Sequence, residues 1–138
     1  MPSGAEPVDR LVLDTSVYSH LRTGHSGVLD LVATAAVVLM PATVLGELEA
    51  AFRLGTRIAE NRRSLAEFLD EPFVSILDVT HAVARRYGET FALLRQSGTP
   101  IPINDVWIAA ATMDCGGQLA TFDRAFTRIP GLLLTLLS

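Results

Sequence analysis

Short apolar segments alternate with longer amphipathic segments along the chain. The short segments have the composition or alternation of strands and cover residues 10–13, 36–40, 73–77, 118–121 and 132–136. Apolar residues recur every three to four positions, as in helices, over residues 15–31, 41–54, 57–69, 80–94 and 104–115. Strands that alternate with helices predict an α/β fold, a three-layer α/β/α sandwich with a mostly parallel central sheet.

Glycines and a proline mark the expected ends of several elements. Gly24 and Gly27 should break the first helical segment, and Gly55 should end the second. Pro41 is suited to the first turn of a helix, where its missing N–H costs no hydrogen bond. Residues 1–9 are expected to be a loose lead-in to the first strand.

The composition favours one domain, residues 1–138, and limits its chemistry. Apolar residues make up 49% of the chain, which suggests that some surface is buried against a partner or a second copy. No apolar run approaches the ~20 residues that cross a bilayer, and no signal peptide is evident, so a cytoplasmic protein with no membrane association is expected. The single Cys115 excludes an internal disulfide and a Cys-based zinc site.

The charged residues exclude further classes. The net charge of −4 argues against a broad cationic surface for nucleic acid. All eleven basic residues are Arg, whereas haloacid-dehalogenase-like phosphatases and response-regulator receivers both combine an Asp at a strand end with a later Lys. The phosphatases also need a second Asp two residues after the first, where this chain has Ser16.

Three aspartates stand where predicted elements begin or end. Asp14 follows the first strand, at the rim where open α/β sheets place their chemistry, although it could also cap the next helix. Asp105 lies on the inward face of its helix, and because Asn104 can cap that helix, Asp105 has no evident structural role. Asp123 follows a short strand and could equally be a turn residue.

A fourth acid comes from the helix predicted over residues 41–54, where the pattern leaves two candidates. Glu47 flanks one edge of the apolar stripe and Glu49 flanks the other. Periodicity does not distinguish them, and either could be an ordinary solvent-exposed helix acid.

The acids gain significance as a set, because all of them are expected at one end of one sheet. Carboxylates gathered at one rim repel one another unless they share a hard cation such as Mg²⁺. Ligands that are all oxygen atoms suit Mg²⁺ or Mn²⁺ better than zinc. The set therefore predicts a site for a divalent cation.

The chain resembles PIN domains, and more narrowly the VapC group of toxin ribonucleases. The matching stretches are LVLDTS at 11–16, TVLGELE at 43–49, NDVWIAA at 104–110 and LATFD at 119–123. They follow the family's order over nearly the whole chain. Each stretch alone is a weak signal, but the four together at these separations are fairly specific.

The resemblance implies which residues form the site. The family's acids correspond to Asp14, Glu47, Asp105 and Asp123, and the small residue before Glu47 and the apolar one after it select Glu47 over Glu49. These acids would be both catalytic residues and ligands of one or two Mg²⁺ or Mn²⁺ ions. The expected substrate-positioning residues are Ser16 and Thr121 at the site and Arg124 and Arg128 for phosphate contacts.

By the same resemblance, the protein would be a metal-dependent endoribonuclease that hydrolyses RNA phosphodiester bonds. Its partner would be a VapB-like antitoxin that covers a groove near the helices at 42–69, and toxin chains would pair as a homodimer. Arg62, set in an otherwise apolar stripe, could contact the antitoxin, or it could lay its aliphatic part over core side chains.

Two alternative functions remain. A PIN-like fold could bind RNA or protein without cutting, although the intact acid set argues against this. A PIN nuclease could also serve in RNA processing, but the short length without an accessory domain favours a toxin.

Overall fold

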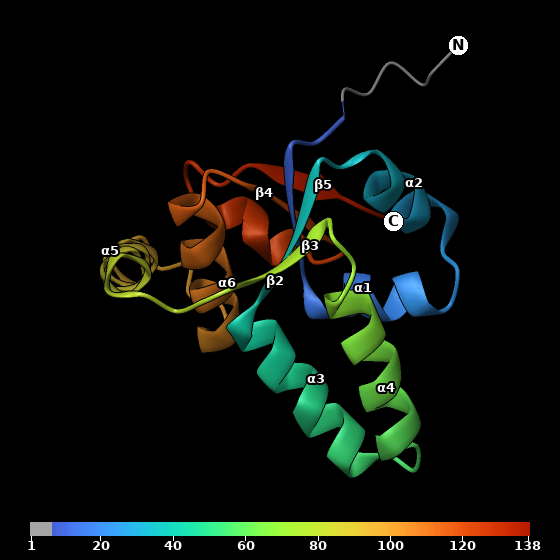
Figure 1. Ribbon diagram of the computed structural model, residues 1–138. Coiled ribbons are helices and arrows are strands. Elements are labelled where there is room, and N and C mark those ends of the chain that lie inside the picture. Colours follow the sequence, from blue (N-terminus) through green and yellow to red (C-terminus); the bar gives the residue numbers. More distant parts are fainter. Residues whose placement is uncertain (1–6) are drawn as a thin grey trace.

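A parallel five-stranded sheet forms the centre of the molecule (Figure 1). In this computed structural model, which describes residues 7–138, the strands are β1 (Arg10–Leu13), β2 (Val37–Pro41), β3 (Val74–Leu77), β4 (Gln118–Thr121) and β5 (Leu134–Leu136). The helices are α1 (Thr15–Arg22), α2 (Ser26–Thr34), α3 (Ala42–Leu54), α4 (Ile58–Leu69), α5 (His81–Gln96) and α6 (Ile103–Asp114), with a 3₁₀ helix, η1 (Arg124–Arg128).

β1 lies in the middle of the sheet, and the strand order is β3-β2-β1-β4-β5. Every neighbouring pair is parallel. The chain builds the sheet outward from β1 to β3 and then returns to the other side of β1 to add β4 and β5. This reversal makes the junction of β1 and β4 the topological switch point, and open α/β sheets bind ligands at the carboxyl ends of the strands there.

The middle strand is buried because helices cover both faces of the sheet. Leu11, Val12 and Leu13 have no exposed surface, as is typical of a strand in a two-sided parallel sheet. In Figure 1, α5 and α6 lie on one side of the sheet, and α1 and α2 lie on the other. The predicted three-layer arrangement is confirmed, and the sheet is wholly rather than mostly parallel.

Most element ends match the sequence pattern, and the main differences are at helix starts. The first predicted helix is two helices, α1 and α2, which separate around Gly24, where φ is +83°. Pro41 is not in the first turn of α3; it ends β2 and is the N-cap of α3, because its ψ of 141° is extended. Asn104 is not the N-cap of α6, since Pro102 takes that position and Asn104 lies in the first turn.

The lead-in expected over residues 1–9 falls largely outside the described residues. Its last part is not loose, because the carbonyls of Val8 and Asp9 accept hydrogen bonds from the N–H groups of Ala36 and Val37 at 3.3 and 3.0 Å. These bonds extend the pairing of β1 with β2. In the described part of the chain, no helix combines the length and the apolar character needed to cross a membrane.

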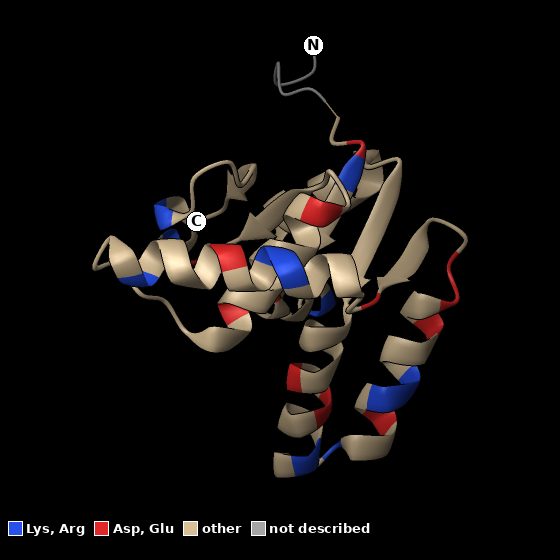
Figure 2. Ribbon diagram, turned by 90° about the vertical axis from the view of Figure 1, so that its left-hand side faces the viewer, with Lys and Arg blue, Asp and Glu red and all other residues tan. Residues whose placement is uncertain are grey.

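α3 and α4 form a hairpin that projects away from the sheet (Figures 1 and 2). Glu49 on α3 accepts a hydrogen bond from Nε of Arg62 on α4 at 2.9 Å, and another from Nε of Arg53 at 2.7 Å. Arg62 therefore faces α3 and pairs with Glu49 across the hairpin.

Candidate active site

Asp14 is a buried carboxylate at the carboxyl end of β1, with only 8% of its surface exposed. It caps α1, because its Oδ1 accepts a hydrogen bond from the N–H of Thr15 at 2.8 Å. Its Oδ2 accepts a hydrogen bond from the hydroxyl of Thr121 at 2.7 Å. Burial raises the pKa of Asp14 despite these two hydrogen bonds, so the residue is more than a surface cap.

Thr121 connects the ends of the two strands at the switch point. Its side chain is fully buried, and its hydroxyl donates to Asp14 while accepting a hydrogen bond from the N–H of Asp123 at 3.0 Å. Asp123 in turn caps η1, since its Oδ1 accepts from the N–H of Ala125 at 2.9 Å. The turn role considered for Asp123 is therefore confirmed.

Glu47 reaches the same region from α3, and polar groups hold both of its oxygens. Oε1 accepts a hydrogen bond from the hydroxyl of Thr15 at 2.5 Å, and Oε2 accepts one from the amide of Asn104 at 3.3 Å. The contacts join α3 to the starts of α1 and α6. Glu49 instead pairs with Arg53 and Arg62 on the projecting hairpin, so the tertiary structure separates the two candidates clearly.

Asp105 lies in the first turn of α6, partly buried, and differs from the other acids in its contacts. Among residues 7–138, no donor forms a hydrogen bond with its carboxylate. Its pKa is raised to about 6, first by burial and then by the negative charges of Asp14, Asp123 and Glu47. These charge effects show that the fold brings the four acids into one neighbourhood.

The donors in this neighbourhood are chemically suited to a hard divalent cation. They are carboxylate, hydroxyl and amide oxygens, and the carboxylates repel one another until a cation is present. Within residues 7–138, no three His, Cys, Asp or Glu side chains already stand in a geometry that would hold a metal ion. The donor set thus fits Mg²⁺ or Mn²⁺ in its chemistry. Of the four acids, Asp105 is the one whose carboxylate accepts no hydrogen bond from the described residues.

The other residues predicted for the site, Ser16, Arg124 and Arg128, do not form hydrogen bonds with the acids in the described part of the chain. Ser16 lies in the first turn of α1, and in the described chain no hydrogen bond connects its hydroxyl to an acid. Arg128 donates from Nη1 to the carbonyl of Pro100 at 3.2 Å, which ties η1 to the loop before α6. Arg124 is exposed at the start of η1, directly after Asp123.

Two polar residues at the site, Thr15 and Asn104, are not among those predicted from the sequence. Both contact Glu47, and each is the immediate neighbour of an acid along the chain, Thr15 of Asp14 and Asn104 of Asp105. That adjacency is the one signal that could have found them. The sequence pattern presents Asn104 as a helix cap, and Thr15 only as a residue of the matching stretch.

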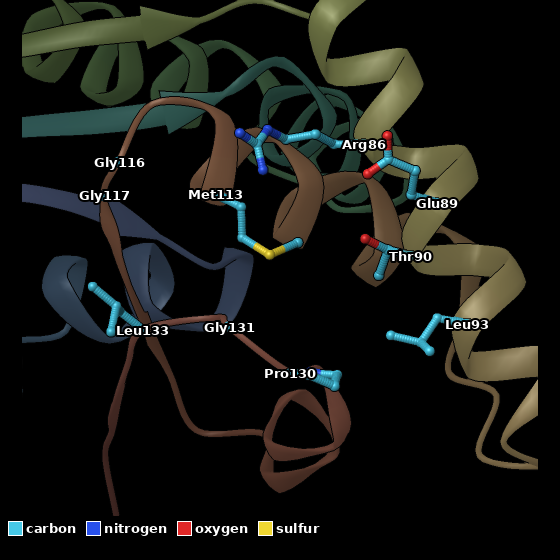
Figure 3. Close-up of a pocket in the computed structure, with 10 residues that line it drawn as sticks. All are labelled: Arg86, Glu89, Thr90, Leu93, Met113, Gly116, Gly117, Pro130, Gly131 and Leu133. Carbon is cyan, nitrogen blue, oxygen red and sulfur yellow. The ribbon is translucent and has the colours of Figure 1, made fainter.

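A separate cavity of about 380 Å³ lies at the other end of the sheet (Figure 3). It is bounded by α5, the end of α6 and the segments that lead into β4 and β5, with Arg86, Thr90 and Met113 among its lining residues. Gly116 and Gly117 come just before β4, so this cavity is at the amino ends of the strands. The four acids belong to the carboxyl ends, and none of them lines the cavity.

Comparison with known families identifies the domain. Residues 11–132 match the family model described as PIN domain. This match covers most of the chain and contains Asp14, Glu47, Asp105 and Asp123. A comparison with curated proteins finds no match.

Solved structures with the same fold come from toxin–antitoxin systems. VapBC2 from Rickettsia felis, bound to a promoter DNA fragment, has a TM-score of 0.83 and 24% identity over 94% of this chain and 99% of that chain. VapBC-1 from nontypeable Haemophilus influenzae has a TM-score of 0.81 and 21% identity over 92% and 97%. Mycobacterium tuberculosis VapC20, described as a sarcin-ricin loop cleaving toxin, has a TM-score of 0.66 and 23% identity over 89% and 96%.

At these identities the likeness establishes the fold. The family model, which spans β2, β3, β4, most of β1 and all four acids, establishes the family. The chain belongs to the PIN domain family.

Proposed function

We propose that this PIN domain is a divalent-metal-dependent endoribonuclease and the toxin of a VapBC-like toxin–antitoxin pair. The observation that carries the proposal is that the PIN fold gathers Asp14, Asp123, Glu47 and Asp105 at the carboxyl ends of β1 and β4, where Thr15, Thr121 and Asn104 bond to them. Burial and the charges of the other three acids raise the pKa of Asp105 to about 6, which agrees with this arrangement. A fold that places acids together at such an electrostatic cost is expected where a cation is bound.

The four acids would have two roles, metal binding and orientation of the attacking water. Asp14 and Asp105 would be the principal ligands of one or two Mg²⁺ or Mn²⁺ ions, and Asp123 would complete the set. When bound, the cation would lower the pKa of a water and offset the charge that develops on the leaving oxygen. Glu47, held on both sides by Thr15 and Asn104, would orient the attacking water.

Individual arginines near the site would bind the RNA, because a chain with a net charge of −4 does not attract RNA over its whole surface. Arg124, exposed beside Asp123, is the best-placed cation for a phosphate contact. Arg128 would contribute mainly by fixing η1 against the loop at Pro100. Ser16 would position water or a phosphate oxygen, and Thr121, whose hydroxyl is buried against Asp14, would act by fixing that carboxylate. The description of VapC20, which shares the fold, as a sarcin-ricin loop cleaving toxin supports the proposed cleavage of RNA.

The partner would be a VapB-like antitoxin, as in the VapBC complexes that share the fold. A groove of about 390 Å³ between α1 and the α3–α4 hairpin is lined by Tyr18, Leu48 and Phe52 together with polar residues. It would accept an apolar antitoxin segment. Arg62, the chain neighbour of the lining residue Asn61, would contact an antitoxin acid in place of Glu49. Two toxin chains would pair as a homodimer.

The proposal is tested by paired substitutions of acids on the same helices. Asp14→Asn and Asp105→Asn should abolish Mg²⁺-dependent cleavage of RNA, and Glu47→Gln should slow it by roughly 100-fold or more. The matched controls are Glu49→Gln on α3 and Asp114→Asn on α6, whose side chains bond to arginines away from the site. Rates are measured on end-labelled RNA with circular dichroism as a check of folding.

Two results would contradict the proposal. One is cleavage at the wild-type rate by folded Asp14→Asn or Asp105→Asn protein free of contaminating nuclease. The other is equal loss in the control variants, which would show that the effect comes from charge in general. An RNA-binding domain that does not cut would give no metal-dependent products with any of the proteins.

A further inference from the structure

We propose that a hollow beside Asp123 is the subsite for an unpaired nucleobase of the RNA, next to the phosphate that is cut; this rests on the proposed nuclease function. The hollow has a volume of about 580 Å³ and is lined by Phe122, Arg124, Leu136, Leu137 and Ser138. That volume is within the roughly 300–1,000 Å³ of sites for small organic groups. We refer to it as the Phe122 hollow.

The hollow adjoins the acids through the chain itself. Phe122 and Arg124 are the two sequence neighbours of Asp123, whose N–H is bonded to the hydroxyl of Thr121. Because Thr121 also holds Asp14, a base in the hollow would belong to a nucleotide whose phosphate is near the acids.

The lining segment that follows β5 is bonded to β4, the strand that Phe122 and Arg124 follow. Leu136 ends β5, and the N–H of Leu137 donates to the carbonyl of Thr121 at 2.8 Å. Leu136 is 39% exposed, so an apolar surface is available at this rim without rearrangement. The hollow and the acids therefore share the carboxyl end of β4 as a common support.

The Phe122 ring is held in a defined orientation. The His20 ring lies 4.3 Å from it between centroids, tilted by 33°, and the His25 ring meets it nearly edge-on at 5.3 Å. His20 is fixed in turn, because its Nδ1 is 2.7 Å from the carbonyl of Ser16. A ring that is already ordered loses little conformational entropy when a base stacks on it.

The lining residues suit a nucleotide. An aromatic ring and two leucines offer stacking and apolar contact to a base, and an exposed guanidinium offers paired donors to its phosphate. Among the described residues, the one charged side chain that lines the hollow is the guanidinium of Arg124. Because a base inside a helix is stacked and paired, the occupant would be a base from a single strand or loop.

The test asks whether Phe122 and one particular base act as a pair. Short single-stranded RNAs are prepared with one base removed at each position in turn, and their Kd values are measured by fluorescence anisotropy with Ca²⁺. For the wild-type protein, one missing base should weaken binding roughly 5- to 150-fold, the range expected for stacking on an aromatic side chain. In Phe122→Leu, that same RNA should bind within about twofold of the intact RNA, since the stacking partner is gone.

Matched variants separate this effect from damage to the fold. Phe122→Leu keeps an apolar side chain against His20, and Phe122→Tyr keeps the ring, so the tyrosine variant should retain the penalty for the missing base. Arg124→Gln should weaken binding of all the RNAs alike, because a phosphate contact carries no base information. Arg85→Gln on α5, an exposed arginine remote from the hollow, should change nothing.

The outcomes distinguish the subsite from the nuclease. Mg²⁺-dependent cleavage is assayed on the same proteins and RNAs. If removing the base weakens binding equally in the wild type and in Phe122→Leu, the subsite proposal is wrong. If both proteins still cleave RNA in that case, the proposed nuclease function is unaffected. If removing the base weakens binding only when Phe122 is present, and no protein cleaves RNA, the subsite proposal holds and the proposed nuclease function is wrong. Absence of both binding and cleavage overturns both.

Discussion

Asp14 and Asp105 are acids of the same neighbourhood with opposite surroundings. Both oxygens of Asp14 accept hydrogen bonds, from Thr15 and Thr121, whereas Asp105 accepts none within residues 7–138. Burial raises the pKa of both, and the charges nearby raise it further. Asp14 is therefore a fixed ligand candidate, and Asp105 is the group whose ionisation responds most directly to a cation.

Without metal, Asp105 should make the protein less stable as the pH rises. Its folded pKa of about 6 exceeds the ordinary value of 3.8, so between these pH values the folded state binds more protons than the unfolded state. Unfolding free energy then falls as pH rises through this window, and Asp14 contributes in the same direction. Thermal unfolding in EDTA should give a higher Tm near pH 4.5 than near pH 7.

Asp105→Asn should flatten that pH dependence and raise the Tm near pH 7, because the repelling charge is removed. Asp114→Asn on the same helix is the control and should leave the difference between the two pH values intact. A pH profile of Asp105→Asn that matches the wild type would show that Asp105 is not the group whose ionisation costs stability.

At the scale of elements, the close contact between β1 and the start of β4 depends on Gly117. A Cβ there would meet Val12 Cγ2 and Cys115 Sγ at 3.0 Å and the carbonyl of Arg10 at 3.2 Å. The carbonyl belongs to the backbone of the central strand, which cannot move without disturbing the sheet. A side chain at this position would therefore push the start of β4 away from β1.

Gly117→Ala should lower the unfolding free energy by about 1–3 kcal/mol, as overpacking does. Gly88→Ala is the matched control, because Gly88 lies inside α5 and a methyl group there would meet nothing within 4 Å, and it should add about 0.5–1 kcal/mol. Urea denaturation of the two variants measures both changes. Equal stabilities of Gly117→Ala and the wild type would show that β4 tolerates a shift away from β1.

At the scale of the whole molecule, strand order is what gathers the acids. Asp14 follows β1 and Asp123 follows β4, so they meet because these strands are neighbours at the switch point. Glu47 and Asp105 arrive on α3 and α6. The chain as a whole is acidic, and the site concentrates that charge at one rim.

A divalent cation should therefore stabilise the folded protein. Mg²⁺ or Mn²⁺ at 100 times its Kd would add about 2.7 kcal/mol if it binds only the folded state. Scanning calorimetry should show a metal-dependent rise in Tm for the wild type and for Asp30→Asn, an exposed acid on α2, but little or none for Asp14→Asn. A Tm indifferent to both cations in the wild type would favour a PIN fold without a metal site.

Much of the fold was accessible from local pattern, and the reasons are physical. A strand covered on both faces must be apolar throughout, as Leu11–Leu13 is, and amphipathic helices must cover it. The predicted starts of α3 at Pro41 and of α6 at Asn104 differ from the structure for the same reason. In each case a proline, Pro41 or Pro102, is the N-cap of the helix. The sequence alone does not show whether such a proline is the N-cap or lies in the first turn.

The sequence by itself determined the α/β alternation and the three aspartates at the starts or ends of their elements, because burial and chain geometry act over a few residues. Only the tertiary structure decided which distant polar groups bond to Asp14 and Glu47. Thr121 reaches Asp14 across 107 positions, and Asn104 reaches Glu47 across 57. Such contacts depend on which strands become neighbours, and that choice is made by the packing of the whole chain.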